Sequence, residues 1–176
     1  MMKIIYSQNF FTNLKSKHLL LDTSFFIDAA NFSDEFLDFT TQCNIHDITL
    51  VTIDPVKAEF LKGSETNVKY ESKLKFITDT IHSILPIPTT ILSEYLPRLV
   101  KGYGELGKGT SIVDFILCSM LQYYQSGLYL LTKNPKDYPN TVTNLHSYFL
   151  LYNTRALQPY LVLENKQPTI GKPTSF

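Results

Sequence analysis

His18-Leu19-Leu20-Leu21-Asp22-Thr23-Ser24 is the stretch of sequence that decides the fold. Three consecutive leucines ahead of an aspartate are typical of a short strand that is buried on both faces and ends on a carboxylate. Thr23 and Ser24 then favour the start of a helix, because their side chains can cap free backbone N–H groups. A buried strand that runs directly into a helix is the building unit of α/β proteins.

The same alternation of strands and helices continues along the chain. Further strands are expected over residues 48–53, 128–131 and 144–152, where β-branched or apolar side chains cluster. Helices are expected over residues 34–41, from Asp54-Pro55 to Gly63, over 67–84, over 92–100 with an interruption at Pro97, and from 111 to about 125. The alternation predicts an α/β fold with a parallel sheet covered by helices on both faces.

The composition is that of an ordinary globular domain. Of 176 residues, 44% are hydrophobic and 18% charged, which is enough to build one core. The sequence contains no apolar run long enough for a membrane span and no apolar leader, and Cys43 and Cys118 form no disulfide framework. We therefore expect a cytoplasmic protein that does not enter a membrane. The formal net charge of zero argues mildly against nucleic-acid binding, although a cluster of acids would mask basic residues elsewhere.

Four acidic residues occupy the places where a parallel sheet presents its ligand-binding rim. One ends a strand, one lies at the edge of the apolar face of a helix, one opens an apolar helix, and one follows a strand in a loop. Taken singly, each has an ordinary structural explanation. The acid at the strand end can cap a helix, and the one on the helix face can be a surface glutamate. The acid that opens a helix can belong to a capping box, and the one in the loop can stabilise a turn. Taken together, they predict an acidic pocket without histidine or cysteine, which favours Mg²⁺ or Mn²⁺. The four residues are Asp22, Glu59, Asp114 and Asp137.

Four segments resemble, in chain order, the motifs of the PIN-domain ribonucleases. They are Leu20-Leu-Asp-Thr-Ser-Phe-Phe-Ile-Asp28, Val56-Lys-Ala-Glu-Phe-Leu-Lys-Gly63, Lys108-Gly-Thr-Ser-Ile-Val-Asp-Phe-Ile-Leu-Cys118 and Leu130-Leu-Thr-Lys-Asn-Pro-Lys-Asp-Tyr138. The resemblance spans roughly residues 18–140. It implies a three-layer α/β/α sandwich with a central, mostly parallel sheet, and Mg²⁺- or Mn²⁺-dependent cleavage of RNA.

The resemblance also divides the chain and suggests its partners. It implies a nuclease domain over residues 18–152, an N-terminal extension over 1–17, and a C-terminal extension over 153–176 that we expect to be loosely ordered. Many family members are VapC-type toxins, which implies an antitoxin protein as a partner in addition to the RNA substrate. PIN domains commonly pair, so a homodimer is expected.

The expected roles of the site residues follow from the metal chemistry of such an enzyme. Asp22, Glu59 and Asp114 are expected to be catalytic metal ligands, and the fourth contact is Asp137, Asn134 or both through water. Side chains that fix the carboxylates by hydrogen bonds are expected at Ser24, Thr132 and Asn134. The flanking lysines are candidates for contacts with RNA phosphates, and they are Lys62, Lys108, Lys133 and Lys136.

Competing interpretations belong to different functional classes. A PIN-like module that has lost catalysis and binds RNA or protein is the main alternative. The glycine-rich segment 102–109 is not a phosphate-binding P-loop, because Gly109 stands where that loop needs Ser or Thr. A phosphatase of the haloacid-dehalogenase type needs a second aspartate two residues after Asp22, where this chain has Ser24.

Overall fold

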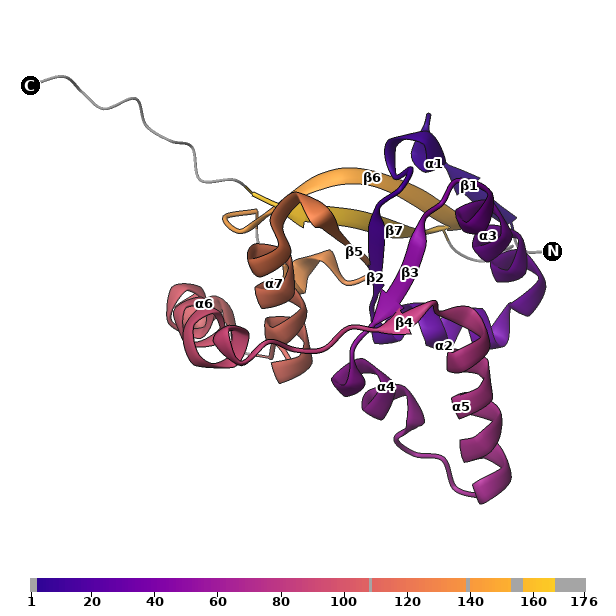
Figure 1. Ribbon diagram of the computed structural model, residues 1–176, viewed down its shortest axis with the longest axis horizontal. Coiled ribbons are helices and arrows are strands. Elements are labelled where there is room, and N and C mark those ends of the chain that lie inside the picture. The colour runs from indigo at the N-terminus through magenta and orange to yellow at the C-terminus, as the bar shows by residue number, and fades with distance from the viewer. Residues whose placement is uncertain (1–2, 108, 139, 153–156, 167–176) are drawn as a thin grey trace, which may run out of the picture.

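A single mixed sheet forms the centre of the protein (Figure 1). The computed structural model describes residues 3–107, 109–138, 140–152 and 157–166. In these parts of the chain the sheet has seven strands in the order β1-β6-β7-β5-β2-β3-β4. The strands are β1 (Lys3–Tyr6), β2 (His18–Leu21), β3 (Thr49–Thr52), β4 (Ser83–Ile84), β5 (Leu128–Thr132), β6 (Thr143–Tyr152) and β7 (Leu157–Asn165).

Most of the strands run in one direction, as the sequence predicts. Strands β5, β2, β3 and β4 are parallel neighbours. Strand β7 runs antiparallel to both β5 and β6, so β6 points the same way as the parallel group, and β1 is antiparallel to β6. The carboxyl ends of β2 and β5 therefore lie side by side, and this end of a parallel sheet is where ligands bind.

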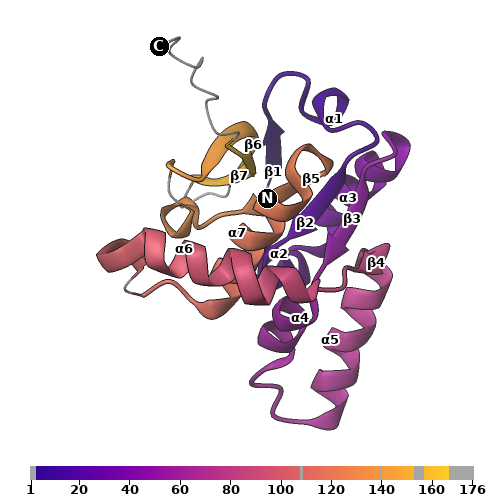
Figure 2. The same ribbon diagram turned by 60° about the vertical axis from the view of Figure 1, so that its left-hand side comes forward.

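Helices cover both faces of the sheet, which gives the expected three-layer α/β/α arrangement (Figures 1 and 2). Helices α1, α2 and α3 pack on one face, while α7 packs against β5 and β7 on the other and carries α6 on its outside. No helix in the described ranges is long and apolar enough to cross a membrane. The α-helices are α1 (Phe10–Asn13), α2 (Thr23–Asn31), α3 (Ser33–Ile45), α4 (Asp54–Leu61), α5 (Asn67–Thr80), α6 (Leu96–Tyr103) and α7 (Ile112–Tyr124). Shorter helical turns are the π-helical η1 (Ile91–Tyr95) and the 3₁₀ turns η2 (Gly104–Gly107), η3 (Gln125–Gly127) and η4 (Pro135–Asp137).

The interruption expected at Pro97 takes the form of the π-helical turn η1. Proline has no N–H and its ring clashes with the carbonyl group four residues earlier, so a regular α-helix cannot run through it unchanged. The Leu96 N–H donates instead to the Ile91 carbonyl five residues back, and α6 continues from there with Pro97 in its first turn. Such wide turns are rare and occur mostly as single insertions between α-helical segments.

Residues from near both ends of the chain pack in the same core as the central strand β2. Leu19, Leu20 and Leu21 are fully buried, as the leucine run predicts. On the α1–α3 face, the ring of Phe149 on β6 lies 5.8 Å from that of Phe10 and 4.8 Å, stacked, from that of Tyr160 on β7. Residues before the predicted domain boundary at 18 and after the one at 152 thus contribute to the same core.

The C-terminal segment differs from the expected loosely ordered extension. Residues 157–165 form β7, which lies inside the sheet between β5 and β6. Pro159 obscures this strand in the sequence, because a proline within an apolar run argues against a central strand. The buried Tyr160 and Val162 nevertheless anchor β7 to the core. Residues 153–156 and 167–176, which belong to the same expected extension, lie outside the described residues.

Because β7 is the link between β6 and the parallel strands, we predict that a chain ending at Tyr152 loses cooperative folding. Its removal leaves the unpaired edges of β5 and β6 facing each other and strips cover from the aromatic core. Thermal unfolding followed by near-ultraviolet circular dichroism measures this. A chain ending at Lys166 is the matched control and keeps its Tm within about 3 °C, whereas a sharp transition of the shorter chain near that temperature would contradict the prediction.

Candidate functional site

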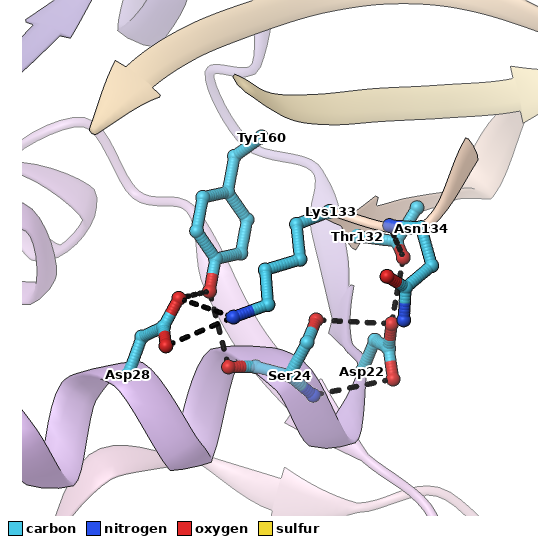
Figure 3. A network of polar contacts seen from close by, with 7 residues as sticks. All are labelled: Asp22, Ser24, Asp28, Thr132, Lys133, Asn134 and Tyr160. Atoms are coloured by element: carbon cyan, nitrogen blue, oxygen red, sulfur yellow. Dashed lines mark hydrogen bonds and ion pairs between the residues drawn. The ribbon is translucent and has the colours of Figure 1, made fainter. Parts of the chain in front are cut away.

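The carboxylate of Asp22 lies at the point where the parallel strands β2 and β5 end. Its side chain is only 5% exposed. The Thr132 hydroxyl at the end of β5 donates to its Oδ2 at 2.6 Å, and the Ser24 hydroxyl donates to the same oxygen at 3.1 Å (Figure 3). The Ser24 N–H donates to Oδ1 at 3.4 Å, which makes Asp22 the N-cap of α2. The two hydroxyl groups and the strand behind Asp22 hold the carboxylate in one orientation.

Burial and a neighbouring charge raise the pKa of Asp22 above its usual range. Loss of solvation is the larger cause, and the charge of Asp114 adds to it. The hydrogen bonds from Thr132 and Ser24 act in the opposite direction, because they stabilise the ionised form. The net shift shows that the folded protein holds this negative charge at a cost, which a bound cation would offset.

Asp114 is fixed at the start of α7 by a complete capping box. The Ser111 N–H and hydroxyl donate to Oδ2 of Asp114 at 3.1 and 2.8 Å, and the Asp114 N–H donates back to the Ser111 hydroxyl. The hydroxyl of the buried Tyr138 donates to Oδ1 at 2.8 Å. Burial, followed by the charges of Asp22 and Asp114, raises the pKa of Tyr138 well above its ordinary value. Tyr138 is therefore a neutral donor beside both carboxylates.

Asp137 lies in the 3₁₀ turn η4, close enough to Asp114 to sense its charge. Burial and the charge of Asp114 raise the pKa of Asp137, while Lys136 lowers it. The Tyr103 hydroxyl donates to the backbone carbonyl of Asp137 at 3.1 Å and so ties α6 to this turn. Asn134, the other candidate for the fourth contact, is exposed, and its N–H donates to the Thr132 hydroxyl at 3.0 Å.

Glu59 approaches the group from α4 and is exposed beside the buried Phe60. Its Oε2 accepts a 2.6 Å hydrogen bond from the hydroxyl of Thr23, the residue that follows Asp22. Glu59 is thus joined to the residue after Asp22, and the charge of Asp114 raises the pKa of both Asp22 and Asp137. Within the described part of the chain, no three histidine, cysteine or acidic side chains are grouped closely enough to form a metal site by themselves.

Two of the acids also have the structural roles that the sequence suggests for them. Asp22 caps α2, and Asp114 belongs to a capping box. These hydrogen bonds leave lone pairs of both carboxylates available for a further ligand, since each oxygen can accept more than one bond. Two carboxylates with further water ligands are a common way to bind Mg²⁺, which keeps much of its hydration shell. The donor set is therefore suited to Mg²⁺ or Mn²⁺, with Asp22 and Asp114 as the central pair.

A second buried polar group lies next to Asp22, and the sequence does not reveal it (Figure 3). The ammonium group of Lys133 contacts both oxygens of Asp28 at 2.9 and 2.8 Å. The Tyr160 hydroxyl on β7 lies 2.7 Å from Oδ2 of Asp28 and 3.0 Å from the Ser24 carbonyl oxygen. This Asp28–Lys133–Tyr160 network joins α2, the loop after β5 and β7 around the base of the candidate site.

A partial signal for this network exists in the sequence. Asp28 lies four residues after Ser24 and therefore on the same side of α2, in a helix with buried Phe25 and Phe26. A carboxylate on a buried helix face requires a partner. The identity of the partners cannot be read from the sequence, because Lys133 and Tyr160 are more than one hundred residues away along the chain.

The four lysines proposed to contact RNA are in different situations. The ammonium of Lys133 is engaged by Asp28, so a phosphate contact by Lys133 requires that ion pair to open. Lys62 at the end of α4 and Lys136 beside Asp137 are exposed, and Lys108 lies outside the described residues.

The chain matches no protein-family model, no curated protein and no solved structure in comparisons with each.

The Lys133–Asp28 ion pair is predicted to contribute strongly to stability. Its side chains are 26% and 9% exposed, so Lys133→Met leaves the Asp28 carboxylate largely buried without its cation. We expect the free energy of unfolding in urea to fall by about 2–3 kcal/mol, below the full cost for a buried pair because Lys133 is partly solvated. Lys136→Met, three residues away and exposed, is the control and changes it by less than ~0.5 kcal/mol. Adding Asp28→Asn to Lys133→Met should recover part of the loss, and equal effects of the two lysine variants would contradict the prediction.

Asp22→Asn is predicted to stabilise the metal-free protein. Because the folded-state pKa of Asp22 is raised, this carboxyl group lowers stability at neutral pH, and the free energy of unfolding rises as the pH falls through that pKa. Asparagine removes the charge and can still accept the Thr132 hydrogen bond. In EDTA at pH 7 we expect the Tm to rise by about 2–4 °C, and this part of the pH dependence to disappear. Glu71→Gln on the exposed side of α5 is the control and should leave the Tm unchanged. A lower Tm for Asp22→Asn would show that the charge of Asp22 does not destabilise the folded protein.

Proposed function

We propose that this protein is a Mg²⁺- or Mn²⁺-dependent endoribonuclease that hydrolyses RNA phosphodiester bonds. The observation that carries the proposal is the pairing of Asp22 and Asp114 at the carboxyl end of the parallel strands. Both carboxylates are rigidly held, and the charge of Asp114 raises the pKa of Asp22. Two fixed, mutually repelling carboxylates, one buried and one half-buried, are what a divalent cation stabilises.

Asp22 and Asp114 would hold the divalent ion, which would supply Lewis-acid activation of water for hydrolysis of a phosphodiester. The neighbouring residues of the chain would hold the two carboxylates in the orientation that this chemistry needs. Thr132 and Ser24 hold Asp22, and Ser111 and Tyr138 hold Asp114. Such supporting hydrogen bonds fix the direction of the ligand oxygens.

The outer acids would act through water. Glu59 and Asp137 are more accessible to solvent than Asp22, and Asp137 lies close enough to Asp114 to sense its charge. Exposed carboxylates near the central pair would accept hydrogen bonds from water at the site. Asn134 would complete the side of the site at which the chain leaves β5.

The wider assignments rest on the resemblance to PIN-domain ribonucleases alone. They are a homodimer and a role as a VapC-type toxin held by an antitoxin protein, whereas the proposed cytoplasmic location rests on the composition and the two unpaired cysteines. A small reading frame for an antitoxin next to the gene would support the toxin role.

One observation favours the alternative of a PIN-like module without catalytic activity that binds RNA or protein. In the described residues, hydroxyl groups occupy positions around the acids, and no three acids are grouped at metal-binding distance. A module of this kind would keep the hydrogen-bonded acids as structural caps and would show no response to Mn²⁺.

Mn²⁺ binding and RNA cleavage are predicted to depend on the same two carboxylates. A metal concentration one hundred times the Kd stabilises a folded protein by about 2.7 kcal/mol, so millimolar Mn²⁺ should raise the Tm of the natural chain by several degrees. Asp22→Asn and Asp114→Asn should remove both this shift and the cleavage of a labelled single-stranded RNA. Calorimetry and gel electrophoresis, with EDTA as the metal-free reference, measure the two effects.

Glu71→Gln is the matched control, because it removes an exposed carboxylate from α5 without touching the site. It should retain both the metal-dependent Tm shift and the cleavage. A natural chain that shows neither effect would contradict the proposed function and favour the binding-module alternative, and cleavage that persists in Asp22→Asn would refute the site assignment.

A further inference from the structure

A cavity of about 610 Å³ lies between η1–α6, α7 and the ends of β6 and β7. Figure 2 shows α6 lying across α7 at this side of the molecule. The volume falls within the range of roughly 300–1,000 Å³ that is typical of ligand pockets. Its walls include Tyr95, Arg98, Tyr103, Gln122, Asn165 and Lys166.

The lining of the cavity is complementary to an anionic ligand. Two of the described lining residues, Arg98 and Lys166, are cationic, and none carries a carboxylate, although the chain as a whole has equal numbers of acids and bases. The Lys166 ammonium donates to the Asn140 carbonyl oxygen at 2.8 Å and keeps two further N–H donors for a ligand. The Arg98 guanidinium is 3.5 Å from the Glu94 carboxylate, and both side chains are exposed at 75% and 53%. An exposed pair of this kind contributes little, so a phosphate can replace Glu94 as the partner of Arg98.

The same cavity presents aromatic and amide groups. Tyr95 is half-buried, and its ring is held edge-to-face against that of Tyr123 at 5.7 Å. Gln122 of α7 and Asn165 of β7 supply amide donors and acceptors. A flat ring next to cations and amides is the combination that binds unpaired bases and the phosphates that join them.

One residue connects this cavity with the acidic site. Tyr103 lines the cavity, and its hydroxyl donates to the Asp137 carbonyl oxygen. Its ring packs edge-on against Phe115 at 4.8 Å, directly after Asp114 in α7. A chain of nucleotides that occupies the cavity therefore lies next to the acids, with the wall formed by Tyr103 between them.

We propose that the cavity between α6, α7 and the β6–β7 end binds a single-stranded segment of RNA. Arg98 and Lys166 contact its phosphates, and Tyr95 stacks on a base. The proposal rests on the proposed ribonuclease function and names the part of the substrate that the protein holds away from the cleaved bond. Recognition by stacking and by phosphate contacts selects unpaired strands over duplexes.

The test is binding of a fluorescein-labelled, mixed-sequence single-stranded RNA of ten nucleotides, measured by anisotropy with the full chain in EDTA. Metal-free conditions separate binding from cleavage. Tyr95→Leu should weaken binding about tenfold while Tyr95→Phe retains it, because the stacking surface and not the hydroxyl is used. Arg98→Glu should weaken binding at least about tenfold. It should also reduce the slope of log Kd against log salt by the amount that corresponds to roughly one phosphate contact.

Lys75→Glu is the matched control for Arg98→Glu, because Lys75 forms an equally exposed ion pair with Asp79 on α5, away from the cavity. It should change the Kd less than about twofold. Equal weakening by Arg98→Glu and Lys75→Glu would overturn the proposal, as would no RNA binding by the natural chain or no difference between Tyr95→Leu and Tyr95→Phe. Failure of the ribonuclease function is seen separately, as RNA that binds in the cavity in EDTA but is not cut when Mn²⁺ is added.

Discussion

The hydrogen bond from Thr132 to Asp22 joins the carboxyl ends of two parallel strands, and the site depends on it. It forms because β2 and β5 pair in a register that places Leu21 opposite Leu131. In this register Asp22, which follows Leu21, and Thr132, which follows Leu131, come to the same rim. α2 then starts directly from Asp22, and the loop after Thr132 turns towards Asp28 and the acids. A change in this register would separate Asp22 from Thr132, while the local contacts of Asp22 with Ser24 and of Asp114 with Ser111 would remain.

Much of the fold is readable from the sequence because its central elements are locally determined. The leucine run before Asp22, the Asp54-Pro55 helix start and the Ser111 capping box each carry their own signal within a few residues. The positions of β1 and β7 could not be predicted. β1 has only four residues, and β7 contains Pro159, which argues against a strand inside a sheet. Both strands depend on distant partners, since β1 pairs with β6, β7 pairs with β5 and β6, and their rings Tyr6 and Tyr160 contact Phe149.

The candidate site shows the same division. The order of the motifs indicates which acids gather, and the strand ends indicate where. The sequence does not indicate how closely they approach, because hydroxyl groups from Thr23 and Tyr138 are placed between or beside them. The Asp28–Lys133–Tyr160 network could not be predicted from the sequence either, because its three members come from three separate elements and meet only when β7 is in the sheet.

The place of β7 has a consequence for the order in which the chain assembles during synthesis. The parallel strands β2, β3, β4 and β5 are complete once residue 132 has been made, and β1 can pair with β6 by residue 152. These two parts of the sheet have no shared edge until residues 157–165 emerge and fill the space between β5 and β6. A nascent chain therefore carries two open sheet edges for some time, which makes this protein a candidate for protection by chaperones while it is translated.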